Sequence, residues 1–192
     1  KPLKLLIKMS IPAIIMALLD ELNSLIDAVF VGQVFGSEAV SSMSIVLPVM
    51  LFIVAFTALI TDGASTAISR YLGANNLKKS NEYLINTVVF SFIIGLVVGI
   101  IFYLFIPDIL KLYDLSEKVR YFADIYLKII SLGMPIFIQV MNLGKILYLE
   151  GKNGYLLLTA FIQLILNILL NYIFIMVLDF GIQGAALGTL AA

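Results

Sequence analysis

The sequence predicts an all-α polytopic membrane protein that folds as a bundle of transmembrane helices. Three observations support this fold class. Hydrophobic residues make up 62% of the 192 residues and charged residues only 12%, about half of the charged fraction that is typical of a soluble domain. The mean hydropathy is +1.11. The apolar runs are also much longer than the roughly ten-residue alternating strands of a transmembrane β-barrel.

Short polar or glycine-containing stretches divide the chain into six apolar segments. These stretches are "GQVFGSEA" (32–39), "LGANNLKKSN" (72–81) and "EGKNG" (150–154). We therefore expect five complete helices and the start of a sixth. Their predicted ranges are 5–35, 39–70, 82–107, 121–149 and 154–179, and the sixth helix begins near Gln183.

Residues 107–124, "PDILKLYDLSEKVRYFAD", alternate charged residues with aliphatic and aromatic residues. This pattern is typical of a helix that lies at the membrane surface. The alternative is an ordinary charged loop with frayed helix ends. The sequence alone leaves both interpretations open.

Basic residues near the helix ends favour a cytoplasmic N-terminus, because cytoplasmic loops carry an excess of Lys and Arg. With the N-terminus inside, seven basic residues fall on the cytoplasmic side and three on the other side. We therefore expect a multi-pass protein of the plasma or inner membrane. The cytoplasmic set is Lys1, Lys4, Lys8, Arg70, Lys78, Lys79 and Lys152, and the opposite set is Lys111, Lys118 and Arg120.

Composition argues against several other classes of function. The chain has no Cys and no His, so the commonest ligands of zinc and haem are missing and we expect no cofactor. The net charge is zero, which gives no basis for nucleic-acid binding. An intramembrane aspartyl protease would need paired Y-D and G-x-G-D sequences. Tyr113-Asp114 falls in the polar segment and G-x-G-D does not occur, so we do not expect an enzyme.

Two predicted helices carry polar stripes inside the membrane. Asp20 and Asp27 lie two helical turns apart on one face of the first helix, with Asn23 between them. The fifth helix repeats a polar residue every four positions, which also places these side chains on one face. The simplest explanation of either stripe is hydrogen bonding between helices. The stripe on the fifth helix consists of Thr159, Gln163, Asn167 and Asn171.

Together, the two stripes can line a polar pocket whose central charge changes during a transport cycle. Charged residues inside a membrane usually face a cavity or a partner. Desolvation raises the pKa of a carboxylate toward the physiological range, so such a group can take up and release a proton. Alternatively, oxygen ligands such as those of Asp27 and Asn167 can hold Na⁺. Either ion would compete with an organic cation for one negative charge, which is the basis of antiport.

Other polar or kinking residues have structural interpretations. Asp62 and Lys145 are expected at similar depths on the second and fourth helices, where they can form a structural or gating ion pair. Pro12 and Pro135 fall inside predicted helices and should kink them. Such kinks can serve as hinges, although membrane helices often simply tolerate them.

Several stretches in the correct order resemble the multidrug and toxic compound extrusion (MATE) family. They are "IPAII…LIDAVFVGQVFG" at the start, "DGASTAISRYLGANN" (62–76), "YLKIISLGMPIFIQVMNLGKILYLEGKN" (126–153), and "LNILLNYIFI" (166–175) followed by "GIQGAALGT" (181–189). The resemblance covers nearly the whole chain. It implies that residues 1–192 are the N-terminal transmembrane lobe of a two-lobe transporter, with the second lobe beyond Ala192.

The same resemblance implies roles for particular residues. Asp27 matches the Asp that couples cations in the first helix of the family, and Pro12, a candidate hinge, matches a proline whose kink responds to protonation in some members. Asn167 and Thr189 match positions of the same polar pocket. Asn171 departs from the pattern, because many relatives carry Asp there, and this removes one carboxylate from an expected Na⁺ site. Asp20 matches no family position.

The function implied is the export of organic cations or amphiphilic drugs in exchange for H⁺ or Na⁺. One alternative is a flippase of lipid-linked precursors, since related exporters share this architecture. Such a flippase favours basic residues deep in the lobe, whereas the charges within the first helix are acidic. Another alternative is a membrane scaffold that does not transport.

Overall fold

The computed structural model describes the backbone of residues 2–192 and the side chains of residues 10–192. The described chain is a bundle of helices without strands, which confirms the predicted fold class. The side chains of Lys1, Lys4 and Lys8, which contribute to the predicted orientation, lie outside the described residues. The elements are α1 (Pro2–Phe35), α2 (Ser37–Gly73), α3 (Leu77–Lys111), α4 (Glu117–Leu149), α5 (Asn153–Asn171), a π-helical segment η1 (Tyr172–Val177) and α6 (Ile182–Ala191).

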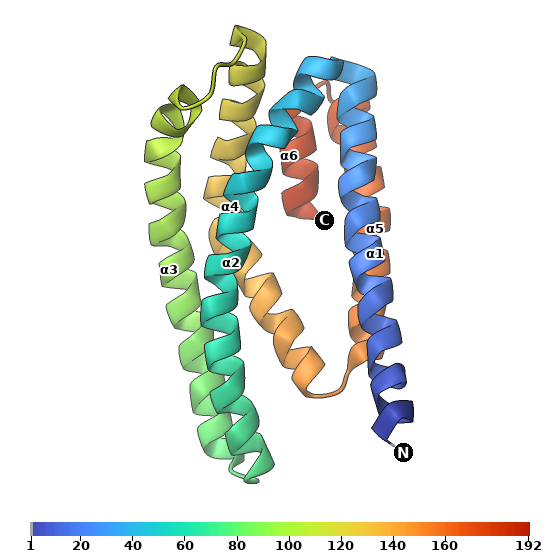
Figure 1. Cartoon of the computed structure of the whole chain (residues 1–192), viewed down its shortest axis with the longest axis vertical. Coiled ribbons are helices and arrows are strands. Elements are labelled where there is room, and N and C mark those ends of the chain that lie inside the picture. The colour runs from blue at the N-terminus through green and yellow to red at the C-terminus, as the bar shows by residue number, and fades with distance from the viewer. Residues whose placement is uncertain (1) are drawn as a thin grey trace.

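Successive helices run up and down the bundle and fall into two groups (Figure 1). α1 packs mainly against α5, while α3 packs against α4 and α2. α6 lies between the groups and contacts both α4 and α1. The two groups diverge toward the end of the bundle that carries the N-terminus (Figure 1). Most of the buried apolar cluster, which includes Val31, Val46, Leu127 and Ala186, therefore lies toward the opposite end.

Four helical stretches in the described part of the chain are long and apolar enough to cross a membrane. Helices of this composition bury few of their side chains within the bundle and contact the lipid bilayer. α1 has 34 residues but carries Asp20, Glu21 and Asp27 in its second half. The four stretches are Ser37–Gly73, Leu77–Lys111, Glu117–Leu149 and Asn153–Val177.

The predicted helix boundaries are close to the observed ones, but α3 and α4 begin four or more residues earlier than predicted. Side-chain caps explain both extensions. Asn76 accepts a hydrogen bond from the backbone N–H of Lys79 at 3.2 Å. Ser116 accepts one from the N–H of Val119 at 3.4 Å. These bonds satisfy N–H groups that the first turn of a helix leaves free.

The predicted surface helix over residues 107–124 is wrong. Residues 107–111 form the last turn of α3, and residues 117–124 form the first turns of α4. Only residues 112–116 connect them. The alternating pattern arises because Leu110, Val119 and Ala123 are buried between the helix ends, while the charged residues face outward.

Small and polar side chains hold α3 closely against α4. Ser91, Gly95 and Gly99 occur every fourth residue on the buried face of α3, and such spacing lets membrane helices approach closely. A Cβ atom added at Gly95 would lie 2.8 Å from the Cα of Pro135. On the same interface, Asn142 Nδ2 donates to Ser91 Oγ at 2.7 Å. Pro135, predicted to kink its helix, is therefore also a packing residue.

The end of α5 continues as a short π-helix. The wider turn begins immediately after Asn171 and ends at Val177. Asp179 and Gly181 then adopt positive φ angles of 51° and 63° and reverse the chain into α6. Single π-helical turns are often found at functional sites, and this one follows directly on the most buried polar residues of α5.

Candidate functional site

Asp27 is a buried carboxylate at the junction of three helices. Its side chain on α1 is only 4% exposed. Asn171 on α5 donates a hydrogen bond from Nδ2 to Asp27 Oδ1 at 2.6 Å. Thr189 on α6 donates from Oγ1 to Asp27 Oδ2 at 3.1 Å. Both carboxylate oxygens therefore have a donor, and each donor comes from a different helix.

Asn167 extends this network along α5. It lies one helical turn before Asn171, and its Oδ1 accepts a second hydrogen bond from Asn171 Nδ2 at 3.0 Å. Both asparagine side chains are completely buried. Even so, Asn167 Nδ2 and Asn171 Oδ1 have no hydrogen-bond partner among the described residues. Buried polar groups are rarely left without a partner, so the site retains capacity for a water molecule or an ion.

Tyr126 on α4 joins the network through Thr189. The Tyr126 hydroxyl lies 3.4 Å from Thr189 Oγ1, and Thr189 Oγ1 is also 3.0 Å from the carbonyl oxygen of Ala185. A threonine hydroxyl has a single hydrogen to donate, so it can bond either to Asp27 or to Ala185 at one time. The sequence did not single out Tyr126, because a tyrosine on an apolar helix face does not indicate which helix its hydroxyl meets.

Two glycines allow α6 to reach the site. A Cβ atom at Gly188 would collide with the side chain of Asn171, and one at Gly184 would lie 2.9 Å from the carbonyl oxygen of Phe174. Only glycine permits this close approach. The spacing Gly184-x-x-x-Gly188 is a small-residue contact motif of membrane helices. This spacing is the sequence signal from which a close contact of α6 with a neighbouring helix could have been predicted.

No basic side chain pairs with Asp27 within the part of the chain that the structure describes. Its partners are neutral donors from an amide and a hydroxyl. A buried charge without a countercharge is strongly disfavoured. Binding of a proton or another cation at Asp27 would neutralise its negative charge. The site is therefore suited chemically to reversible cation binding.

Several residues of the predicted stripes lie outside this network. Asp20 and Gln163 are exposed on the surface of the lobe, as is Thr159. Asn23 is half-buried, and its Oδ1 is buried without a hydrogen-bond partner among the described residues. On the helix face that Asp20 and Asp27 share, Asp27 is buried and Asp20 is exposed.

The predicted ion pair between α2 and α4 is present. Lys145 Nζ lies 2.7 Å from Asp62 Oδ1, and the two side chains are 39% and 60% exposed, respectively. Lys128 pairs with Asp124 one turn earlier on its own helix, at 2.6 Å. Pro12 lies inside α1 and is half-buried.

Comparison with known proteins places this geometry in a family. The family model described as MatE matches residues 12–173, which is most of the chain and includes Asp27, Asn167 and Asn171. The chain belongs to the MatE family. The resemblance predicted from the sequence is thereby confirmed, and the chain is part of a multi-pass membrane protein.

Several known transporters are similar to this chain in sequence and in structure. The chain is 30% identical to multidrug export protein MepA of Staphylococcus haemolyticus over 97% of its own length and 41% of that protein. It also superposes with a TM-score of 0.87 and 28% identity on an outward-facing multidrug resistance MATE family transporter of the MOP superfamily, covering 96% of this chain and 41% of that one. The chain thus spans about two-fifths of the length of its relatives.

A MOP superfamily transporter from Pyrococcus furiosus matches equally well, with a TM-score of 0.87, 28% identity, and the same coverage of 96% and 41%. That protein is described as having a binding pocket of reverse polarity, which suggests a different function for it.

Proposed function

We propose that the full-length protein exports organic cations or amphiphilic drugs in exchange for an inward-moving ion, with this chain as its N-terminal lobe. The observation that carries the proposal is Asp27, a buried carboxylate held only by neutral donors from α5 and α6. A fixed structural carboxylate in a membrane usually has a cationic partner. One without such a partner can bind a transported ion.

In the proposed cycle, the ion and the substrate compete for the negative charge of Asp27. A proton would neutralise Asp27 directly. Na⁺ would instead need several oxygen ligands, and Asn171 Oδ1 is a buried oxygen without a hydrogen-bond partner in the described part of the chain. Rotation of the Thr189 hydroxyl toward Ala185 would release Asp27 Oδ2 when the ion binds.

Acidic residues on the exposed face of α1 favour cationic substrates. Asp20 and Glu21 are both exposed in the middle of α1, where a charge that faced lipid would be strongly disfavoured. We propose that they face a water-filled substrate cavity between this lobe and the rest of the protein, with Asn23 and Gln163 nearby on its wall. Pro12 would act as a hinge in α1, since the residue four positions earlier lacks its helical hydrogen bond.

The alternative substrate is a lipid-linked precursor with an anionic pyrophosphate. This alternative is kept because related exporters share the same helical architecture. In the present chain, the ionisable residues near the middle of α1 are all acidic. This charge favours an exporter of cations over a carrier of pyrophosphates.

Transport by proteoliposomes that contain the full-length protein tests the proposal. The vesicles are loaded with a fluorescent organic cation, and a pH gradient and a Na⁺ gradient are imposed separately. We expect one gradient to drive transport and Asp27→Asn to abolish it. Asparagine has nearly the same shape and keeps one oxygen for Asn171, so loss of transport would reflect loss of the charge.

Asp114→Asn is the matched control, because it makes the same substitution in the exposed connection between α3 and α4. It should transport like the parent protein. If Asp27→Asn still transports under the same gradient, Asp27 is only a structural polar group. If the parent moves no cation under either gradient, the flippase or a scaffold without transport activity becomes the better proposal.

A further inference from the structure

A cavity with charged and apolar lining residues lies away from the Asp27 network, where α3 ends and α4 begins. Its volume is about 340 Å³. Pro107 and Leu110 form its apolar part, and Tyr121 lies at its edge. The charged residues that line it are Lys111, Glu117, Arg120 and Asp124.

Among the described residues, the ion pairs around the cavity do not include the guanidinium group of Arg120, which can therefore bind an anion. Lys111 pairs with Asp108 at 2.7 Å, and Asp124 pairs with Lys128 at 2.6 Å. Arg120 makes no ion pair within the residues that the structure describes. The Lys111–Asp108 pair is exposed on both sides, at 67% and 63%, and such surface pairs are weak. Lys111 can therefore turn toward an anion bound beside Arg120.

We place the cavity at the level of lipid headgroups from the apolar outer face of α3. α3 contacts only α2 and α4 to a substantial extent, and it exposes Ile93, Ile100 and Leu104 along its outer face. The cavity lies at the end of this apolar face. Tyr121, at its edge, is 60% exposed, as is typical of aromatic residues at a membrane interface.

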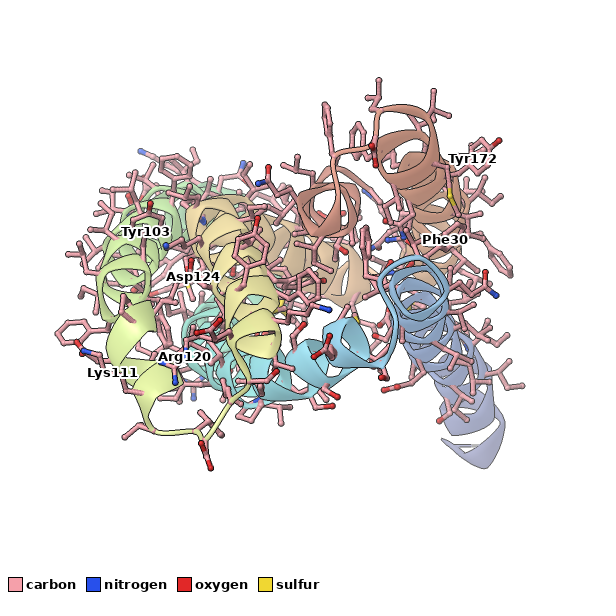
Figure 2. The ribbon with its side chains drawn as sticks, turned by 90° about the horizontal axis from the view of Figure 1, so that it is seen from above. Phe30, Tyr103, Lys111, Arg120, Asp124 and Tyr172 are labelled. Atoms are coloured by element: carbon pink, nitrogen blue, oxygen red, sulfur yellow. The ribbon has the colours of Figure 1, made fainter. Side chains whose placement is uncertain are left out.

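Two helices contribute the basic groups that line the cavity. Figure 2 shows Lys111 at the end of α3 and Arg120 in the first turns of α4, both on the side of the bundle away from Phe30 and Tyr172. A guanidinium group presents a planar set of donors that fits phosphate oxygens in pairs. Lys111 adds a second, more flexible positive charge.

We infer that this cavity binds the headgroup of a membrane phospholipid, recognised through its phosphodiester. Arg120 is the main phosphate ligand and Lys111 the second, while the acyl chains lie along the apolar face of α3. The carboxylate of Glu117, which also lines the cavity, would accept a hydrogen bond from the amine of a zwitterionic headgroup. The site is separate from the Asp27 network, and the inference does not depend on the proposed transport function.

Photo-crosslinking with the full-length protein in detergent tests the inference. A phospholipid with a photoreactive group near its headgroup is added, and labelled peptides are mapped by mass spectrometry. We expect labelling within residues 107–124. Unlabelled phosphatidylglycerol and phosphatidylethanolamine should both compete, because they share the phosphodiester. Diacylglycerol with the same chains and inorganic phosphate should compete at least tenfold more weakly.

Three variants complete the experiment, each checked by size-exclusion chromatography. Arg120→Gln should reduce labelling of this segment by about tenfold, as expected for the loss of a charge-assisted bond. Lys111→Gln should reduce it several-fold, and it provides the test if Arg120→Gln fails to fold. Lys118→Gln is the control, because Lys118 is an exposed neighbour that pairs with Glu38 and does not line the cavity.

Several outcomes would overturn the inference. Labelling of this segment in Arg120→Gln and Lys111→Gln that equals the labelling in Lys118→Gln would remove the basis for phosphate recognition. Equal competition by diacylglycerol would indicate an apolar groove only. Equal competition by inorganic phosphate would indicate a site for free anions rather than for lipid. Labelling confined to other segments would place the bound lipid elsewhere.

Discussion

Asn171 stands where the resemblance to the family implies an Asp in many relatives, and its side chain contacts the buried carboxylate of Asp27. Its Nδ2 atom lies 2.6 Å from Asp27 Oδ1 and donates a hydrogen bond to it. An aspartate at position 171 would place two carboxylates in contact. Two buried carboxylates this close cannot both remain ionised unless a cation lies between them.

We therefore predict that Asn171→Asp makes the full-length protein more responsive to Na⁺. Thermal denaturation in NaCl and in choline chloride should differ more for the variant than for the parent. A Na⁺ concentration about four times the Kd would add about 1 kcal/mol of stability. The double variant Asp27→Asn/Asn171→Asp is the control, because it moves the carboxylate without creating a pair. An equal response to Na⁺ in all three proteins would contradict the prediction.

Thr189 allows a test of the hydrogen bond at the other oxygen of Asp27. Thr189→Val keeps the shape of the side chain but removes the hydroxyl that lies 3.1 Å from Asp27 Oδ2. Leaving a buried acceptor without its donor should lower stability by about 1–3 kcal/mol. Thr189→Ser retains the hydroxyl and should remain close to the parent. The melting temperatures of the purified full-length proteins distinguish these results, and equal losses in both variants would attribute the effect to packing.

Among the described elements, α3 and α4 share the most extensive contact, and glycine residues let the two helices approach each other closely. Gly95 faces Pro135, whose backbone would lie 2.8 Å from an added Cβ atom. Gly63, in the interior of α2, has no neighbouring atom within 4 Å of the same position. The two glycines therefore provide the same substitution in a crowded and in an open environment.

Gly95→Ala should destabilise the protein by about 1–3 kcal/mol, because the interface must separate to admit one methyl group. Gly63→Ala should be neutral or slightly stabilising, since alanine favours the helix by about 1 kcal/mol over glycine. Thermal denaturation of the two full-length variants provides the measurement. If both variants melt at the temperature of the parent, the contact between α3 and α4 is looser than the structure indicates.

The whole molecule has two ends that should lie on opposite sides of the membrane. The connections 74–76 and 150–152 lie at the end that carries the N-terminus, and residues 112–116 lie at the other end (Figure 1). The count of basic residues predicts that the first of these ends is cytoplasmic. Residues 1–192 contain no Cys, so single-cysteine variants can report the orientation once any cysteines elsewhere in the protein are replaced.

We expect Asp114→Cys to react with a membrane-impermeant maleimide on intact cells, and Lys78→Cys to react only after the cells are permeabilised. Both positions are exposed in the structure, so the difference in labelling would reflect sidedness alone. The reverse pattern would place the N-terminus outside. It would also place the cavity lined by Lys111 and Arg120 at the cytoplasmic leaflet of the membrane.

At the level of helices, most of the fold follows from local sequence. Long apolar runs must satisfy their backbone hydrogen bonds within themselves, so helices and their approximate ends are readable without tertiary contacts. The predicted surface helix failed because alternating charge can also mark two helix ends that share a buried face. Leu110 and Val119 are buried there, which the one-dimensional pattern does not reveal.

The sequence by itself determined the membrane class, the helices, and the residue types that make Asp27 and Asn167 candidates for a polar site. Only the tertiary structure decided that Asp27 is buried while Asp20 is exposed, and that Tyr126 joins Asn171 and Thr189 in one network around Asp27. The reason is that periodicity assigns a residue to a face of its own helix but does not determine which helices converge on that face. The convergence depends on the glycines of α6 and on the divergence of the two helix groups.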